Sequence, residues 1–467
     1  MTRRFEGLAR VARSSLFAVL VGAVVLLSAA FYNRFPLTFW DTRAYVEHAG
    51  TLVPRPDRLI GYSLFILATS LHVSLWPVAI SQCLLVSWLL FVVNRTLFRE
   101  GASLRHLAVV VIVATFTALP WIAGQLMPDV FTSVLVLALF VLVEDPEQGG
   151  ALRAALLGLV ALSVSVHLTH FPLGFGVLAS LAGAVWFTRG RVVWSRFLAP
   201  ALALVSGLVG IAAFNFAESG KLSLAGGSDA FLLGHLVDSG IAERMLDEHC
   251  PARGYLLCPY RKAFPMTADE FLWDDKLDLD PWHHPAPIAK EAHRLLQDSL
   301  VEHPAMHVGV ALSYAGRQLV RFRTGEGLDA DAVPLIEPRI AEFSPGDLPA
   351  YRKARQQTGA IPVDALRRVH TPVGAAALLL GIAFLAVARF PNLLSPRLDP
   401  AVRFVSALWT VLVINAVLAG NLSGVTDRYG SRLVWLMVFA MLAIGADALS
   451  AERRGVTSAV RRGPRSC

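Results

Sequence analysis

The sequence predicts an all-α polytopic membrane protein, with about ten transmembrane helices and a mostly helical outer domain between the seventh and eighth helices. Of its 467 residues, 55% are hydrophobic and only 16% are charged, and the mean hydropathy is +0.55. Soluble chains carry about 25% charged residues on average. The apolar residues also gather in runs near the length that crosses a bilayer, roughly 17–25 residues.

The runs divide the chain into three blocks. The expected spans lie near residues 14–32, 78–94, 107–122, 130–144, 154–170, 173–187, 197–214, 372–388, 404–419 and 433–449. A further apolar piece, 60–76, contains Gly, Ser, Thr and His, so we interpret it as a membrane-surface or partly embedded helix. Residues 1–214 then form a membrane block of seven spans, 215–370 a polar outer domain, and 371–467 three spans with a basic tail.

Basic residues in the short loops predict the orientation, because cytoplasmic loops of membrane proteins are enriched in Lys and Arg. With an even number of spans, the basic turns fall on one side; they carry Arg3, Arg4, Arg10, Arg13, Arg95, Arg99, Arg105, Arg189, Arg191 and Arg196. We therefore expect a multi-pass protein of the bacterial inner membrane with both termini in the cytoplasm. The net charge of +7 reflects these turns and indicates no nucleic-acid partner.

The outer domain contains cysteines and histidines that could carry chemistry. Cys250 and Cys258 share the stretch HCPARGYLLCPYR. An oxidising compartment lets such a pair form a disulfide, which we expect here, the alternative being two free thiols. His303 and His307 are four residues apart, but they do not form the H-E-x-x-H pattern, so they predict no zinc site.

Asp41 follows the first span in the outer loop, directly before the helical stretch TRAYVEHA. It can cap that helix by accepting hydrogen bonds from backbone N–H groups of the first turn. The alternative is a carboxylate held at the outer membrane surface as a general base or substrate ligand. Arg43 and Tyr45 follow it in the same polar cluster, which we expect to line a cavity.

Further polar residues are expected at the outer ends of later spans. Asp129, in GQLMPDVFTS, is either the cap of the fourth span or a second acid that faces Asp41 across a cavity. His167 and His170, in SVHLTHFPLG, are three residues apart, which places them on one face of the fifth span. We expect them to line the cavity, because no further metal ligand stands nearby.

Two arginines stand on the outer side against the usual charge bias. The stretch DRYGSRLVWL places Arg428, Tyr429 and Arg432 at the start of the last span. An anionic partner such as a phosphate would explain the arginines, because guanidinium groups bind phosphate through two parallel hydrogen bonds. The alternatives are an ion pair with Asp427 or contact with a lipid headgroup.

Several of these stretches resemble one family. An Asp after span one is followed four residues later by Tyr, and then comes RLIGYSLFILATSLHVSLW. ALPWIAGQLMPDVFTSVLVLALFVLV and DRYGSRLVWLMVFAML stand near the middle and the end. Together they resemble membrane glycosyltransferases of the GT-C class, which use polyprenyl-phosphate sugars and include relatives of protein mannosyltransferases and aminoarabinose transferases. RLIGY lacks both prolines of the family motif, and no second acid directly follows Asp41.

The resemblance implies transfer of a sugar from a polyprenyl-phosphate donor, within the membrane lipid, to an acceptor on the outer side, which is a cell-envelope lipid, a glycan or a protein. By resemblance Asp41 is the catalytic base, and Asp129 is a second acid near the acceptor or a metal. Arg428 contacts the donor phosphate, and Arg432 lies on the same side. The resemblance requires no cofactor and leaves a divalent metal open.

Two other functions stay open at this stage. A transporter or flippase for a lipid-linked sugar would often show repeat symmetry, and the sequence has no internal repeat. A non-enzymatic assembly protein of the cell envelope would use the outer domain as a docking surface. In that case Asp41 and Asp129 would serve only as helix caps.

Overall fold

The computed structural model describes residues 15–461, except 54, 56, 99–101, 221, 275–276, 280, 283, 331–332 and 391–394. Within these ranges the chain forms helices and no β-strand, which confirms the all-α prediction; a single isolated bridge joins Leu37 and Gln125. The N-terminal arginines up to Arg13, together with Arg99, His283 and the side chains of the basic tail from 451 on, lie outside the described residues.

The α-helices are, in chain order, α2 (Ser28–Asn33), α3 (Thr42–Thr51), α4 (Ile60–Ser70), α5 (Trp76–Leu97), α6 (Ala102–Phe116), α7 (Leu119–Ala123), α8 (Val130–Glu144), α9 (Gly150–Val166), α10 (His170–Arg189), α11 (Ser195–Ser219), α12 (Ser228–Asp238), α13 (Ile241–His249), α14 (Ala268–Trp273), α15 (Pro285–Glu302), α16 (Pro304–Leu319), α17 (Val333–Phe343), α18 (Leu348–Arg352), α19 (Val363–Ala388), α20 (Asp399–Leu422) and α21 (Asp427–Arg461). Three short 3-10 helices are η1 (Cys258–Ala263), η2 (Pro345–Asp347) and η3 (Pro396–Leu398).

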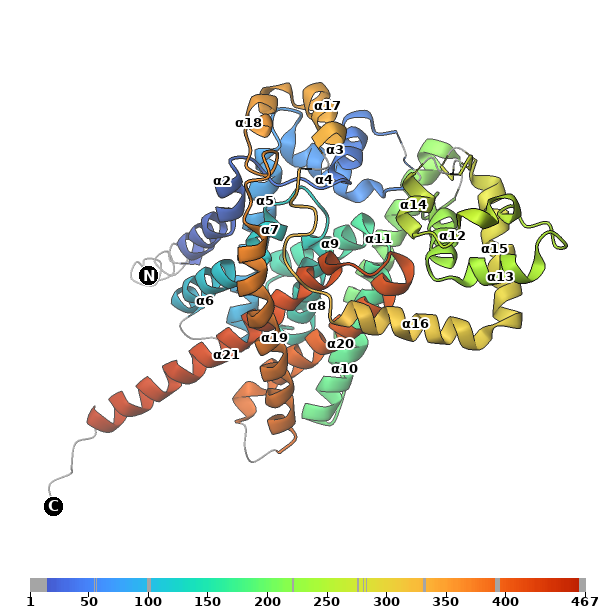
Figure 1. The fold of residues 1–467 in the computed structure, drawn as a ribbon. Coiled ribbons are helices and arrows are strands. Elements are labelled where there is room, and N and C mark those ends of the chain that lie inside the picture. The colour runs from blue at the N-terminus through green and yellow to red at the C-terminus, as the bar shows by residue number, and fades with distance from the viewer. Residues whose placement is uncertain are drawn as a thin grey trace, which may run out of the picture.

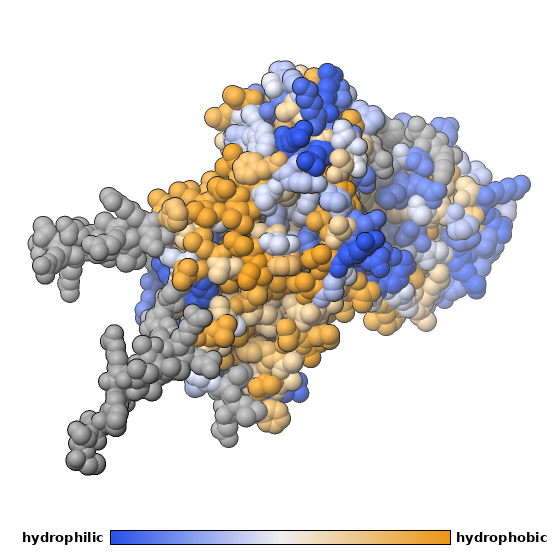
Figure 2. Space-filling model, turned by 60° about the vertical axis from the view of Figure 1, so that its left-hand side comes forward, coloured by the Kyte–Doolittle hydropathy of each residue, from blue (hydrophilic) through white to orange (hydrophobic). Residues whose placement is uncertain are grey.

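Among the residues that the structure describes, seven helices are long and apolar enough to cross a membrane, so the chain is a multi-pass membrane protein. They are Ser15–Asn33, Trp76–Leu97, His170–Arg189, Ser195–Glu218, Val363–Ala388, Pro396–Leu422 and Asp427–Ser450. Figure 2 shows the hydrophobic surface as a band over this bundle, with hydrophilic surface above it and beside it. The other three predicted spans correspond to α6, α8 and α9, which have 15, 15 and 17 residues. The piece 60–76 contains the 11-residue α4, which is too short to span.

Helix α8 lies at the centre of the bundle. Every residue from Val130 to Val143 is buried, and the helix packs against α5, α9, α10, α20 and α21. A helix that is apolar on all sides is buried on all sides. Its two ends carry the acidic residues Asp129 and Glu144, and each of them meets an arginine from another helix. The two ends differ in how closely these ion pairs are made, at 2.6 Å for Glu144 and 3.3 Å for Asp129.

Among the described residues, the helices of the polar stretch 215–370 do not share one core as the predicted single outer domain would (Figure 1). Helices α12 to α15 enclose a hydrophobic core of their own, which includes Leu233, Met245 and Leu295. Helix α16 packs mainly against α20, whereas α17 packs over α3 and α18 packs against α17. Ile336 and Tyr351 belong to the core of the membrane bundle. The cause is burial: each part buries its apolar face against a different neighbour.

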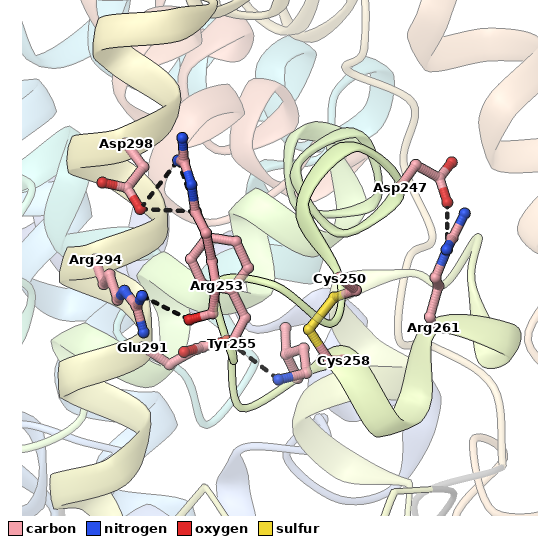
Figure 3. The surroundings of a disulfide bond; sticks show 10 residues. Asp247, Cys250, Arg253, Tyr255, Cys258, Arg261, Glu291, Arg294 and Asp298 are labelled. Carbon is pink, nitrogen blue, oxygen red and sulfur yellow. Dashed lines mark hydrogen bonds and ion pairs between the residues drawn. A yellow bond between two sulfur atoms is a disulfide. The ribbon is translucent and has the colours of Figure 1, made fainter.

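The first part, hereafter the α12–α15 block, contains the disulfide. Cys250 and Cys258 are bonded, and their Cα atoms lie 5.6 Å apart. Figure 3 shows how the loop between them is held to α15. The Tyr255 hydroxyl donates a hydrogen bond to Asp298 at 2.7 Å, and the backbone N–H of Leu257 donates to Glu291 at 3.1 Å.

Candidate functional site

The loop that carries Asp41 is joined to the turn that carries Asp129 by backbone hydrogen bonds. The N–H of Leu37 donates to the carbonyl of Gly124 at 2.9 Å, and the N–H of Leu126 donates to the carbonyl of Leu37 at 2.8 Å. The Thr42 hydroxyl adds a bond to the carbonyl of Leu126 at 3.1 Å. These bonds bring together two segments that are more than 80 residues apart in the sequence.

A buried glutamine holds the same loop from its other side. Gln356 accepts a hydrogen bond from the N–H of Thr38 at 3.0 Å and donates to the carbonyl of Thr38 at 2.8 Å. Its own backbone N–H donates to the side chain of Asn33 at 2.7 Å. The position of the Asp41 loop therefore depends on the segment that follows α18, which the sequence analysis did not single out.

Asp41 stands at the N-cap position of α3, but its side chain accepts no capping hydrogen bond. The carboxylate pairs with Arg58, and its other oxygen lies 3.6 Å from Nη1 of Arg428. Burial by itself would raise the pKa of Asp41, but the charges of Arg58 and Arg428 outweigh it and hold the pKa below its ordinary value. The interpretation of Asp41 as a helix cap is therefore wrong for this structure.

Asp129 shows the same departure from capping. It precedes α8 directly, and its side chain makes no capping hydrogen bond. Its carboxylate instead accepts from Nη1 of Arg432 at 3.3 Å and lies 3.7 Å from Nε of Arg428. Arg428 thus stands between the two aspartates and forms an ion pair with each of them. We call Asp41, Arg58, Asp129, Arg428 and Arg432 the charge cluster.

Several contacts orient Arg428 within the charge cluster. Its guanidinium lies over the ring of Phe39 at 4.4 Å and over the ring of Tyr429 at 5.0 Å. Its backbone N–H donates to the carboxylate of Glu326 at 2.9 Å. The Nη2 of Arg428 also donates to the Tyr429 hydroxyl at 3.2 Å, whereas the ring faces attract the cation without supplying a hydrogen-bond acceptor. The guanidinium is therefore positioned while part of its hydrogen-bonding capacity stays unused.

The charge cluster has more donors than acceptors. Three guanidinium groups contact two carboxylates. Four buried nitrogens have no hydrogen-bond acceptor among the described residues, and they are Nε of Arg58, Nε and Nη1 of Arg428, and Nε of Arg432. Buried polar groups are nearly always paired, and an unpaired one costs about 1–3 kcal/mol. A ligand with several anionic oxygens would supply the acceptors.

Arg432 is tied into the bundle more firmly than Arg428. Its Nη2 donates to the side chain of Asn415 at 2.9 Å, and its backbone carbonyl accepts from the Ser133 hydroxyl at 2.6 Å. Arg432 is 2% exposed, whereas the side chain of Arg428 is 16% exposed. Of the two arginines, Arg428 is therefore the better placed to reach a ligand.

His167 and His170 lie next to each other at a turn, and the expectation of one helical face is wrong. His167 follows the end of α9 in an extended conformation, and His170 begins α10, with ring centroids 5.3 Å apart. The Nδ1 of His170 donates to the carbonyl of Ser163 at 2.6 Å, and its Nε2 accepts from the Thr132 hydroxyl at 2.8 Å. Both ring nitrogens of His170 are therefore hydrogen-bonded. His167 lies close enough to the three arginines of the charge cluster to interact electrostatically with them.

The two residues that follow Asp41 in the predicted cavity differ in their surroundings. Tyr45 is buried beside the charge cluster, and its ring meets the ring of Tyr62 edge-on at 5.0 Å. Burial raises the pKa of Tyr45, so the phenol is neutral and can serve as a donor. Arg43 makes no ion pair or side-chain hydrogen bond with any residue that the structure describes, and nothing joins it to the charge cluster.

The α12–α15 block reaches the charge cluster through α14. The guanidinium of Arg58 lies 6.0 Å from the ring of Trp273, which in turn stacks on Trp282 at 4.9 Å. Burial, followed by the charges of Asp238 and Asp41, raises the pKa of Asp269 in the same helix. One wall of the site is therefore aromatic and belongs to a part of the chain far from the membrane helices in sequence.

The charge cluster does not fit a divalent metal ion. Its two carboxylates already pair with guanidinium groups, and a cation there would face three positive charges. Within the described ranges, one group has side chains spaced for a metal: Glu248, Glu302 and His303 in the α12–α15 block. Those side chains already pair with neighbours, since His303 contacts Glu248 at 2.8 Å and His249 contacts Glu302 at 2.6 Å.

Sequence reasoning missed Arg58 and Asn415 as members of the site, and it left Glu326, in VRFRTGEGL, with either a structural or a substrate-facing role. Arg58 carried a usable signal, because it is a basic residue in an outer loop, against the same charge bias that singled out Arg428. Asn415 carried none, since its role follows from a contact with a residue 17 positions away. No family model, curated protein or solved structure matches this chain.

Proposed function

We propose that this protein is a membrane glycosyltransferase of the GT-C type, which moves a sugar from a polyprenyl-phosphate donor to an acceptor on the outer side of the membrane. One observation carries the proposal. Arg428 stands between Asp41 and Asp129, and its Nη1 and Nε lie 3.6 and 3.7 Å from their carboxylate oxygens, too far for a hydrogen bond. Sugar transfer from a phosphate donor needs an acid that can act as a base next to donors for anionic oxygens, and this arrangement supports that combination.

The donor phosphate is bound by Arg428 and Arg58. Both guanidinium groups have an unpaired Nε, and the phosphate oxygens supply the missing acceptors. As the bond between the anomeric carbon and the phosphate oxygen breaks, its electron pair passes to that oxygen. The growing negative charge is stabilised by donors that are already in place, which is the usual source of most catalytic effect. Arg432 acts through Asp129, which it helps to hold beside Arg428.

The acceptor is activated by Asp41. Its lowered pKa keeps the carboxylate ionised at neutral pH, so it is always in the proton-accepting form. The acceptor oxygen or nitrogen attacks the anomeric carbon while its proton passes to Asp41, which then releases the proton to water. The products are the glycosylated acceptor and the polyprenyl phosphate. Trp273, which is exposed and lies 6.0 Å from the guanidinium of Arg58, offers an aromatic surface to the acceptor.

We further propose that the chain crosses the bacterial inner membrane ten times, with both termini in the cytoplasm. The helices α6, α8 and α9 would supply the three crossings beyond the seven long ones, at about 22–26 Å each. Because α8 is enclosed by protein on all sides, it needs no lipid-length surface. The disulfide supports an oxidising location for the α12–α15 block.

The direct test uses the purified full-length protein in vesicles that contain polyprenyl-phosphate-linked hexose, pentose or aminosugar with a labelled sugar. Release of polyprenyl phosphate together with a labelled covalent product supports the proposal. Accumulation of the label without a covalent product would establish transport instead. If none of the donors is consumed or moved, the transferase function is withdrawn.

A binding measurement tests the phosphate site separately. We expect polyprenyl phosphate to bind at least tenfold more tightly than the polyprenol of the same length, because only the phosphate offers acceptors to Arg428. The variant Arg428→Gln should remove this difference. Arg321→Gln is the matched control, because Arg321, in the segment after α16, pairs with Asp427 at the start of α21, at 3.7 Å. Equal binding of the two lipids would contradict a phosphate site.

A further inference from the structure

A second group of arginines lies at the other end of α10 from the charge cluster. Arg189 ends α10, Arg191 follows in the connection, and Arg196 lies in the first turn of α11. They line one pocket of about 80 Å³, together with Val143, Val185, Val193 and Phe197. Helix α10 begins at His170 beside the charge cluster and has 20 residues, so this pocket is about 28 Å away along the helix.

Positive charge is in excess at this pocket. The nearest acid, Glu144, accepts two hydrogen bonds from Arg403, at 2.6 and 2.7 Å, and lies 3.6 Å from Arg189. Its charge is therefore already shared between two guanidinium groups. Neither Arg191 nor Arg196 forms an ion pair or a side-chain hydrogen bond with any residue in the described part of the chain. Arg191 and Arg196 therefore have guanidinium N–H donors available for a ligand.

The pocket stands at a membrane surface. The connection 190–194 joins two helices that are each long and apolar enough to cross the bilayer. Trp186, Phe187 and Trp194 around it are 63%, 65% and 71% exposed. Tryptophan and other aromatic residues that are exposed at the ends of spans lie at the level of the lipid headgroups.

An apolar track leads away from the pocket along α11. Leu198, Leu202, Val205 and Val209 are all exposed, and their spacing of four, three and four residues puts them on one face of the helix. Leu198 directly follows the pocket residues Arg196 and Phe197 in the chain, so a lipid-facing surface begins one residue beyond the pocket. This surface distinguishes a site for a lipid from a site for free phosphate.

We propose that this pocket binds the headgroup phosphate of an anionic phospholipid, with an acyl chain along the exposed face of α11. Arg191 and Arg196 donate hydrogen bonds to the phosphate oxygens, as basic pockets between transmembrane helices do for anionic headgroups. The site is independent of the proposed transferase function. It would anchor the α10–α11 connection to the anionic leaflet.

The test titrates the full-length protein in detergent with phosphatidylglycerol and with phosphatidylcholine of the same acyl chains, and counts bound lipids by native mass spectrometry. We expect phosphatidylglycerol to bind at least tenfold more tightly to the wild type. The double variant Arg191→Gln/Arg196→Gln should weaken its binding about fivefold for each arginine removed. Arg191→Lys/Arg196→Lys should retain most of the affinity.

Arg95→Gln is the matched control, because Arg95 is an exposed arginine in the last turn of α5. An equal loss in this control, or equal binding of the two lipids, would overturn the proposal. Displacement of phosphatidylglycerol by an equal concentration of inorganic phosphate would show a free-phosphate site instead. If the double variant is not recovered, each single variant must still show its fivefold loss.

Discussion

The two ends of α8 carry acidic residues that meet arginines in different ways. At one end, Arg403 donates to both carboxylate oxygens of Glu144, at 2.6 and 2.7 Å, and its remaining Nη1 donates to Thr188 at 2.9 Å. At the other end, Asp129 is 3.3 Å from Arg432 and 3.7 Å from Arg428. The first pair is closed and saturated, whereas the second leaves guanidinium nitrogens without acceptors.

The difference separates a structural ion pair from a binding site. Arg403 and Glu144 are 0% and 2% exposed, and all the geometry that a buried pair needs is present between them. The side chains of Asp129 and Arg432 are also buried, at 4% and 3% exposure, so a ligand would reach the charge cluster through Asp41 and Arg428, which are 19% and 16% exposed. We propose that one end of α8 holds the bundle together and that the charge cluster at the other end binds an anion.

The largest effect is expected for Asp41→Asn, which keeps the shape of the side chain and removes the base. Sugar transfer should fall about 10²- to 10⁴-fold per folded molecule, since general-base catalysis contributes that much. The measurement is product formation in vesicles, normalised to correctly folded protein. Asp364→Asn is the control, because Asp364 is 84% exposed and pairs only with Arg367. Transfer at the wild-type rate would exclude Asp41 as the base.

The second prediction concerns the closed end of α8. Arg403→Gln leaves the buried Glu144 without its bidentate partner and should destabilise the protein by about 3–5 kcal/mol. Binding of polyprenyl phosphate per folded molecule should not change. Arg428→Gln should do the reverse, with binding weakened about 10- to 100-fold and a much smaller loss of stability. Thermal unfolding in detergent and lipid binding are measured on both variants. If both variants lost stability and lipid binding to the same extent, the proposed difference between the two ends of α8 would be refuted.

A smaller effect is expected from Gly430, which lies between Arg428 and Arg432 in α21. A Cβ there would overlap the backbone carbonyl oxygen of Arg321, so Gly430→Ala forces the first turn of α21 to shift. We expect a loss of about 1–3 kcal/mol and weaker phosphate binding. Gly445→Ala, in the same helix, has open space around it and should be neutral or slightly stabilising. If both variants behave alike, close packing at Gly430 does not position Arg428.

The smallest effect concerns pH and His48 in α3. Burial, together with the charge of Arg55, lowers the pKa of His48 to about 4, from an ordinary value of 6.5. The folded chain binds this proton less tightly than the unfolded chain does, so stability is full above pH 6.5 and declines as the pH falls toward 4. Between pH 7 and 5 the loss is about 2 kcal/mol. His48→Leu should flatten the dependence of the melting temperature on pH over that range, and an unchanged slope would contradict this assignment.

Much of the fold could be predicted because hydrophobic runs report directly on helices that contact lipid. Each of the ten predicted ranges contains a helix, and the fifth range was wrong only where α9 ends at Val166 and His170 begins α10. The polar stretch 215–370 could not be divided from its composition. Whether an amphipathic helix such as α17 packs on the α12–α15 block or on α3 depends on which apolar surface it meets, and local sequence does not specify that surface.

The sequence identified residues of the candidate site better than it predicted how they are arranged. Charge bias in the outer turns pointed to Arg428 and Arg432, and position after a span pointed to Asp41 and Asp129. Helix capping was equally consistent with both aspartates, because a cap depends only on the next few residues. In the structure the two aspartates form ion pairs instead of caps. Packing brings Arg58 to Asp41 from 17 residues away in the sequence, and Arg432 to Asp129 from 303 residues away.

The sequence by itself determined that this chain is a helical membrane protein, where its apolar helices lie, and which cysteines are close enough to bond. These properties follow from composition and short-range spacing. Only the tertiary structure decided that Asp41 and Asp129 share Arg428, and that one end of α8 is saturated while the other is not. Such properties depend on distances between residues far apart in the chain, and only packing sets those distances.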